Sequence, residues 1–243
     1  MKARIINNIL LSAIGLLLTM CNTSSSKTDT KNQLARLAVI EVDSSLIESY
    51  NEFLIEEVEA SIKLEPGVIT LYAIAEKNKP QHVTLFETYG DSSEYQSHLK
   101  TPHFQKYKQG TLDMVKHLDL IPMQEILYHR SEKLSTSRSD SFYIRLIKLQ
   151  IDPDAINKFK ALGNDVMLPG VKNEPGVLVM YALAEKEDPS KISILEVYES
   201  INAYEEHLES PHYKQYKESA EGLVKSLEFT EVNPLLLGSK PQH

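Results

Sequence analysis

The sequence predicts an α+β protein in which one β-α-β-β-α-β unit occurs twice. The first observation is a repeat without gaps, because Glu-Pro-Gly at 65–67 returns at 174–176, an offset of 109 residues. Roughly a quarter to a third of the aligned positions are identical, which indicates a duplicated domain and not a short-period solenoid. The second observation is that apolar runs of strand length alternate with helical periodicity in each copy. We therefore expect domains at 34–128 and 142–237, joined by a polar linker at 129–141.

Composition narrows the class of function. The chain has 243 residues, of which 42% are hydrophobic and 25% charged, as in ordinary globular proteins. The net charge of −8 argues against an electrostatic nucleic-acid site, so we expect no nucleic-acid partner. The single cysteine, Cys21, excludes an intrachain disulfide and a cysteine-based zinc or iron–sulfur site, and we expect no metal centre.

The N-terminus has the pattern of a targeting segment. Lys2 and Arg4 precede an apolar run at 9–18, which is too short to span a membrane, and Cys21 follows. This pattern resembles a bacterial lipoprotein signal, in which the cysteine is lipidated. We expect a signal peptide at 1–21, a Ser/Thr-rich tether at 22–33, and an extracytoplasmic protein held at the membrane by its lipid. Met20 stands where that pattern prefers a small residue, so an ordinary secretory signal and an uncleaved anchor stay open.

Each copy opens with a strand followed by a helix. The residues at 34–42 are mostly apolar or β-branched, which predicts the first strand. Asp43 is a good N-cap for a helix whose apolar residues recur at 47, 50, 54, 58 and 62. In the second copy Asp152 and Pro153 predict the same start, and Glu-Pro-Gly predicts a turn that ends the helix.

The rest of each copy predicts a hairpin, two short helices and a last strand. The strands lie at 68–76 and 83–89, and Asp91 caps a helix at 91–99. Thr101-Pro102 and Ser210-Pro211 start a new helix, and strands near 119–128 and 228–237 close the copies. This order is the ferredoxin-like arrangement, with helices on one face only. We expect the two sheets to face each other as a pseudo-dimer within one chain, enclosing a barrel with helices outside; further oligomerisation stays open.

Spaced motifs in both copies resemble a known family. Glu65 and Tyr72 are followed by Glu87 and Tyr89, then by His98 and Thr-Pro-His-Phe at 101–104. Together they resemble the antibiotic biosynthesis monooxygenase (ABM) family, especially its small quinol monooxygenase-like members. The resemblance implies a dimeric α+β barrel formed here by one chain.

The resemblance also implies a function. Family members include monooxygenases that need no cofactor and oxidise quinols or anthrone-like polyphenols, so we expect no cofactor, with O2 and a small aromatic or quinol-like ligand as partners. Haem-degrading members characteristically use a tryptophan, which this chain lacks. A ligand-binding lipoprotein without catalysis and an isomerase on the same fold stay open.

Oxygenation without metal or flavin needs a base, an oxyanion donor and an apolar pocket, because the ionised substrate supplies the electrons. The polar residues kept in both copies can serve these roles. The candidate catalytic residues are His98, His103, Tyr72, His207, His212 and Tyr181. The candidate substrate-binding residues are Glu87, Tyr95, Phe104, Glu196, Tyr204 and Tyr213.

Each candidate also has a purely structural interpretation. His103 lies at the second position of a helix, where the dipole favours a neutral ring, but it can equally bond a neighbouring loop. His98 can bond helix-end carbonyls, and Tyr72, like Tyr181, can be a core aromatic. Glu87 lies on an apolar row, so we expect Arg36 to pair with it, as Arg145 would with Glu196. Two active pockets and a shared folding requirement both explain why the copies keep these residues.

Overall fold

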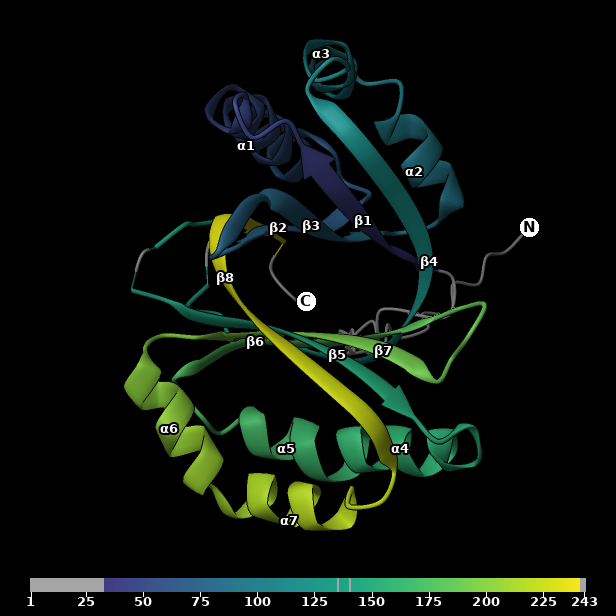
Figure 1. The fold of residues 1–243 in the computed structure, drawn as a ribbon, viewed down its shortest axis with the longest axis vertical. Helices are drawn as coiled ribbons and strands as arrows, with labels where there is room; N and C mark the ends of the chain where they lie inside the picture. The colour runs from purple at the N-terminus through teal and green to yellow at the C-terminus, as the bar shows by residue number, and fades with distance from the viewer. Residues whose placement is uncertain (1–32, 135, 140, 241–243) are drawn as a thin grey trace, which may run out of the picture.

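In the computed structural model, which describes residues 33–134, 136–139 and 141–240, eight strands close into one barrel with helices outside it (Figure 1). The strand order is β1-β3-β2-β8-β5-β7-β6-β4. The predicted signal peptide, its Cys21 and residues 22–32 of the tether lie outside the described residues. Within the described ranges, no helix is both long enough and apolar enough to cross a membrane.

The two halves repeat one order of elements. The first half contains β1 (Leu34–Val42), α1 (Ile47–Leu64), β2 (Val68–Glu76), β3 (Lys79–Tyr89), α2 (Ser92–His98), α3 (Pro102–Gly110) and β4 (Val115–Arg130). The second contains β5 (Tyr143–Ile151), η2 (Pro153–Ala155), α4 (Ile156–Leu162), η3 (Gly163–Met167), α5 (Leu168–Val171), β6 (Val177–Glu185), β7 (Lys191–Tyr198), α6 (Ile201–Glu209), α7 (Pro211–Ser219) and β8 (Val224–Ser239). The duplicated ferredoxin-like fold that the sequence predicts is confirmed.

The long last strand of each half joins the halves. The first part of β4 pairs with β1 and its second part pairs with β6, while β8 pairs first with β5 and then with β2. In Figure 1, β8 crosses from the lower helices to the upper sheet, and β4 crosses in the opposite direction. Because each sheet is completed by a strand of the other half, neither sheet keeps its full set of backbone hydrogen bonds alone.

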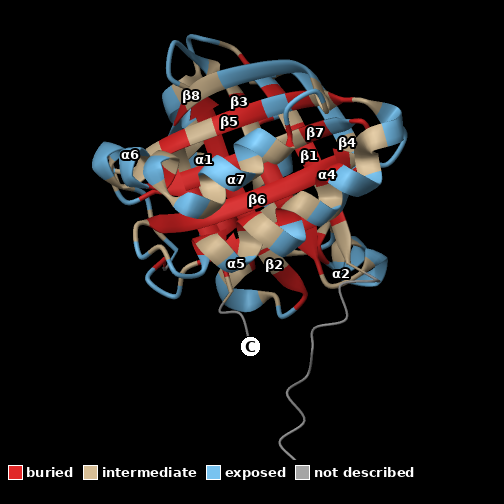
Figure 2. Ribbon diagram, turned by 90° about the horizontal axis from the view of Figure 1, so that it is seen from below, coloured by how far each residue is buried: buried red, intermediate tan, exposed pale blue. Residues whose placement is uncertain are grey.

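Alternating side chains produce three apolar cores. Residues such as Tyr72, Phe86 and Tyr181 fill the barrel interior. The opposite faces of the same strands pack against the helices, with Leu71 and Leu85 in the first half and Met180 and Ala182 in the second. Figure 2 shows strand β6 buried beneath the helices of the second half. Because successive side chains of a strand point to opposite faces, one sheet serves both the barrel and the helix layer.

Most helix caps follow the prediction. The Asp91 side chain accepts from the backbone N–H of Ser93 and Glu94, and Thr101 and Ser210 cap α3 and α7. The prediction for Asp43 is wrong, since Leu46 is the N-cap of α1 and Asp43 instead closes a turn on the Ser45 N–H at 2.9 Å. The last strands are longer than predicted, so residues 129 and 130 of the predicted linker belong to β4 and β8 continues to Ser239.

The first helix of the second half departs from its counterpart. Where α1 is one helix of 18 residues, the second half has a 3-10 turn, a short α-helix, a π-helical segment at Gly163–Met167 and another short α-helix. Single-turn π segments often occur at functional sites. The halves therefore differ most in the helix that covers the sheet.

Candidate functional site

Each half holds a glutamate in contact with two histidines. Glu65 follows α1, and its Oε1 lies 2.9 Å from His98 Nδ1 and 2.7 Å from His103 Nε2. In the second half Glu174 Oε1 lies 3.0 Å from His207 Nδ1 and also contacts His212 Nε2. The turn after the first helix and the junction between the two short helices thus bring the three side chains together.

The glutamate of Glu-Pro-Gly is a site residue that the sequence analysis interpreted only as part of a turn. Burial raises the pKa of Glu65, but the hydrogen bonds from His103 and His98 outweigh it and hold the pKa below its ordinary value. A Cβ at Gly67 would lie 2.1 Å from the Glu94 carboxylate, so a larger residue there requires the Glu94 side chain to move. The presence of Glu, His and His in both copies was the signal in the sequence that these three act together.

An arginine and a glutamate form a second cluster beside each first one. Arg36 Nε donates to Glu87 Oε2 at 2.5 Å, and the Tyr89 hydroxyl donates to the same oxygen at 2.9 Å. Arg36 also contacts the hydroxyl and the ring of Tyr95. The predicted pairing of Arg36 with Glu87 is confirmed.

The second half has the same cluster in a looser form. Arg145 Nη1 lies 3.5 Å from Glu196 Oε2 and donates to the Tyr204 hydroxyl at 2.8 Å. The hydroxyl of Tyr198 donates to Glu196 at 3.2 Å. Burial raises the pKa of Glu196 above its ordinary value in spite of the charge of Arg145. The predicted ion pair is confirmed, but Arg145 lies farther from Glu196 than Arg36 lies from Glu87.

Two of the predicted catalytic residues lie elsewhere. Tyr72 and Tyr181 are fully buried inside the barrel, on the sheet face opposite Glu87 and Glu196. Their hydroxyls bond Tyr128 at 2.9 Å and Thr88 at 2.6 Å. Burial raises the pKa of both phenols, which keeps them protonated. The structure therefore does not bring these tyrosines together with the histidines.

The second half contains a cavity of about 680 Å³ between its sheet and its helices. Its walls are mainly apolar and come from strands β4–β8 and from α4, η3, α6 and α7, and its size suits a small aromatic ligand. Three of the predicted site residues line it, namely Glu196, His207 and Tyr213, together with Arg145, the ion-pair partner of Glu196. Tyr213 packs on the His207 ring at 5.0 Å.

The corresponding space in the first half is filled. Leu54, fully buried between α1 and the sheet, aligns with Gly163, which lines the cavity. Tyr50 is also fully buried, and its hydroxyl bonds that of Tyr107 at 2.8 Å, whereas the aligned residue Phe159 has no hydroxyl. The loss of one leucine side chain therefore removes four carbon atoms from the interior of the second half. The sequence analysis missed Gly163, although a glycine inside a predicted helix was the available signal.

Two buried polar atoms in the cavity wall lack hydrogen-bond partners among the described residues. They are Nε2 of His207, a residue 1% exposed, and Nε of Arg145, and both residues line the cavity. In the first half Arg36 Nε is bonded to Glu87, and His98 Nε2 lies 3.6 Å from Glu57 Oε1. Buried polar groups are rarely left unpaired, so this wall is suited to a ligand that supplies oxygen atoms.

The first half has a buried glutamate that the second half lacks. Glu57 is buried, accepts from the Ser61 hydroxyl at 2.7 Å, and aligns with Val166 in the second half. Burial raises its pKa to about 8. Phe104, the counterpart of Tyr213, packs on His98 with ring centroids 4.7 Å apart. His98, His103 and Phe104 of the first half are therefore grouped around one another.

The comparisons with known proteins agree with this architecture. The sequence matches the family described as antibiotic biosynthesis monooxygenase over residues 34–110 and 142–219. The protein is therefore a tandem α+β-barrel protein of the monooxygenase-like class. More particularly, the chain belongs to the antibiotic biosynthesis monooxygenase family, with one family domain in each half. No curated protein matches the chain significantly.

Solved structures share the fold over the whole barrel. A protein from Lactobacillus acidophilus NCFM, provisionally described as a monooxygenase, is 20% identical with a TM-score of 0.78; the match covers 86% of this chain and 96% of that one. One from Fusobacterium nucleatum, described in the same way, is 17% identical with a TM-score of 0.77, covering 87% and 96%. A protein from Bacteroides thetaiotaomicron, provisionally described as an antibiotic biosynthesis monooxygenase, is 54% identical over a match that covers 38% of this chain and 89% of that one, with a TM-score of 0.38.

Proposed function

We propose that this protein is a monooxygenase that oxidises a quinol or another electron-rich phenol with O2 in the cavity of its second half. The observation that carries the proposal is the apolar cavity of about 680 Å³ with the unpaired Nε2 of His207 and Nε of Arg145 in its wall. Membership of the family supports the proposed reaction type, and the apolar wall with its two unpaired polar atoms supports the proposed substrate class. Its N-terminal segment supports a location outside the cytoplasm.

His207 is suited to act as the base. Glu174 accepts a hydrogen bond from Nδ1, so the proton of the neutral ring stays on Nδ1 and Nε2 keeps a free lone pair. A phenol bound in the cavity donates its proton to Nε2, and the resulting phenolate lies in a wall that also carries the Arg145 guanidinium. The role of His212 is to hold Glu174 from the other side.

The redox balance needs no further reductant. A quinol phenolate gives electrons to O2, one oxygen atom forms a new bond to the ring carbon, and the other leaves as water. The ring loses two hydrogen atoms and gains one oxygen atom, so the four electrons that O2 accepts all come from the substrate. The product is a hydroxyquinone, and the protein supplies ionisation, orientation and exclusion of water.

The test compares aerobic with anaerobic incubation of the chain from Lys31 onward, which contains every described element. A panel of quinols and anthrones is followed by oxygen uptake and by product mass under isotopically labelled dioxygen. We expect incorporation of one labelled oxygen atom per product. Replacing His207 by Gln lowers turnover about 10²–10⁴-fold if the base role is correct, while His117→Gln, on the exposed start of β4, serves as the matched control.

The outcomes separate the candidate functions. Labelled product that forms equally well with His207→Gln contradicts the base role but keeps the monooxygenase. No turnover, with a quinol that nevertheless raises the unfolding temperature, indicates a ligand-binding protein without catalysis. A product that is an isomer of the added compound and needs no oxygen indicates the isomerase alternative.

A further inference from the structure

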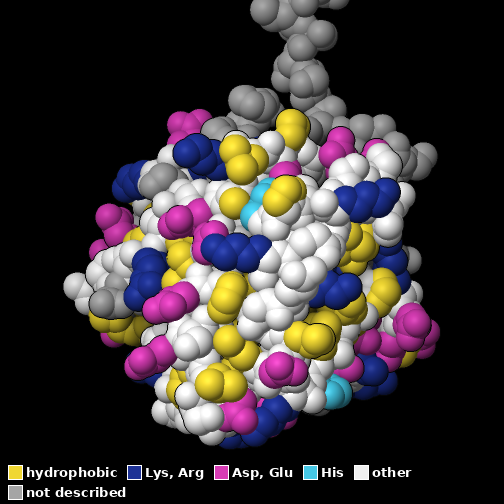
Figure 3. Space-filling view, turned by 90° about the horizontal axis from the view of Figure 1, so that it is seen from above, with side chains coloured by type: hydrophobic (Ala, Val, Ile, Leu, Met, Phe, Trp, Pro, Cys, Tyr) yellow, Lys and Arg dark blue, Asp and Glu magenta, His cyan; other side chains and the backbone are white. Residues whose placement is uncertain are grey.

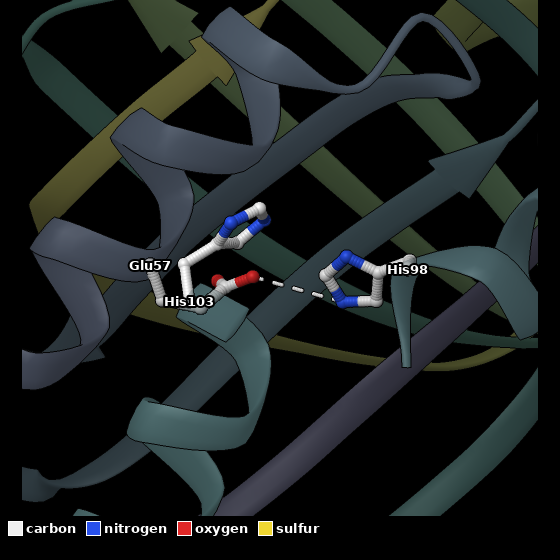
Figure 4. Close-up of side chains that lie close together, drawn as sticks. All are labelled: Glu57, His98 and His103. Atoms are coloured by element: carbon white, nitrogen blue, oxygen red, sulfur yellow. Dashed lines mark ion pairs between the residues drawn. The ribbon is translucent and has the colours of Figure 1, made fainter. Parts of the chain in front are cut away.

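The first half contains a buried group of four titratable side chains that the proposed reaction does not use. They come from α1, the turn after it, α2 and α3: Glu57, Glu65, His98 and His103. Their side chains are 5%, 11%, 3% and 13% exposed, respectively. Figure 4 shows Glu57, His98 and His103 converging beneath the helices. Two carboxylates and two imidazoles are the oxygen and nitrogen donors that bind Zn²⁺ in proteins.

The spacing of the donors is close to that of a metal site. Glu65 Oε1 lies 2.9 Å from His98 Nδ1 and 2.7 Å from His103 Nε2, and Glu57, His98 and His103 each offer a ligand atom within 4.8 Å of the others. Zinc bonds of about 2.0–2.1 Å in tetrahedral geometry separate neighbouring ligand atoms by roughly 3.3 Å. The Glu65 carboxylate therefore needs to move by only about half an ångström from each imidazole to admit the ion.

Glu57 adds the feature that distinguishes this group from an ordinary hydrogen-bonded pair. Its Oε1 lies 3.6 Å from Nε2 of His98, the nitrogen that does not face Glu65, and Ser61 holds the carboxylate by a bond of 2.7 Å. A histidine that binds a metal usually donates its other ring N–H to a carboxylate, a backbone carbonyl or a water, which fixes the tautomer and increases the basicity of the ligating nitrogen. Glu57 stands where it can do this, or can bind the ion itself.

The group also has a route to solvent. A surface depression of about 520 Å³ lies against it, and its walls include Glu65, Thr101, Pro102 and His103. A hydrated cation can therefore reach Glu65 and His103 before it loses its water. On the face that carries α1–α3, acidic side chains are interspersed with basic ones (Figure 3).

The second half does not repeat the full set of donors. Glu174, His207 and His212 are present and close together, but Val166 replaces Glu57 and Gly170 replaces Ser61. His207 Nε2 consequently has no carboxylate, and it belongs to the cavity wall. The two halves therefore differ at this place, because the second has an apolar cavity and the first has a group of four titratable side chains.

We propose that the first half binds one divalent transition-metal ion of the zinc class through His98, His103 and Glu65, with Glu57 supporting His98 or completing the coordination. The ion would link α1, α2 and α3 and make the first half the rigid partner of the pair. The proposed ligands come from α2, α3 and the turn after α1, and Glu57 is the member of the group that the second half lacks.

The test is calorimetric titration of the metal-free chain from Lys31 onward with Zn²⁺, with Co²⁺ as a spectroscopic probe through its visible absorption. We expect one tightly bound Zn²⁺ per chain and a Co²⁺ spectrum of a low-coordinate site. His103→Ala removes both signals, whereas its counterpart His212→Ala keeps them. Circular dichroism of each variant shows whether it is folded.

A second variant keeps the proposal testable if His103→Ala does not fold. Glu57→Val introduces the residue of the second half, and loss of a carboxylate that supports a ligand typically lowers metal affinity about 10–100-fold. Absence of saturable Zn²⁺ binding overturns the proposal. Equal affinity in Glu57→Val and the natural chain, or loss of binding in His212→Ala in place of His103→Ala, overturns it as well.

Discussion

Gly163→Leu is expected to stabilise the protein and abolish its activity together. Gly163 lines the cavity, and its counterpart Leu54 is fully buried in the first half. The backbone of Gly163 is helical, with φ −58° and ψ −48°, and a Cβ there would meet only Leu127 Cδ1, at the ordinary contact distance of 3.6 Å. A leucine therefore fits the backbone and places four carbon atoms in the cavity.

The magnitude follows from two effects. Replacing glycine by leucine inside a helix gains about 0.8 kcal/mol from helix propensity, and full burial of the leucine side chain gains about 1.5–3 kcal/mol. The sum, about 2–4 kcal/mol, corresponds to a rise in unfolding temperature of roughly 4–15 °C for a domain of this size. A ligand at 100 times its dissociation constant stabilises the natural chain by about 2.7 kcal/mol, and this stabilisation disappears in the variant.

The assay combines calorimetric unfolding, with and without quinol, and oxygen uptake. Gly163→Ala is the matched control, because it gains most of the helix propensity and fills little of the cavity. We expect Gly163→Ala to unfold at a higher temperature than the natural chain and still to be stabilised by quinol. We expect Gly163→Leu to gain no stability from quinol. Full turnover in Gly163→Leu, or lower stability than the natural chain, refutes the assignment of this cavity as the substrate site.

Two further predictions concern buried charges. Arg36→Met leaves Glu87 buried without its cation and should lower the free energy of unfolding, measured with urea, by about 3–5 kcal/mol. Arg145→Met should lower it clearly less, because the Arg145–Glu196 pair is 3.5 Å apart and the Arg36–Glu87 pair is 2.5 Å apart. Equal losses of unfolding free energy in the two variants would contradict this difference between the halves. Burial raises the pKa of Glu125, so its contribution to stability is complete below the ordinary carboxyl pKa and is lost as the pH rises through the higher folded pKa. Glu125→Gln should remove this decline, and parallel pH curves for the two proteins would show that Glu125 does not cause it.

Local signals determined most of the elements. The N-caps of α2, α3 and α7 follow from a side-chain oxygen placed before the first turn, and both Pro102 and Pro211 occupy the first helical position. Asp43 carries the same signal but closes a turn, since the chain between it and Ile47 is long enough to form one. The π-helical segment was not predicted, because Gly163 is also compatible with an uninterrupted α-helix.

The sequence by itself determined the duplication, the ferredoxin-like order of each half, the family and the pairing of Arg36 with Glu87, because each of these depends on residues at constant spacing or on one face of a strand. Only the tertiary structure decided which residues meet across elements. It placed Glu65 between two histidines of other helices and separated Tyr72 from them by the thickness of the sheet. It also showed that the halves differ, because whether a missing side chain leaves a cavity depends on how the surrounding helices pack.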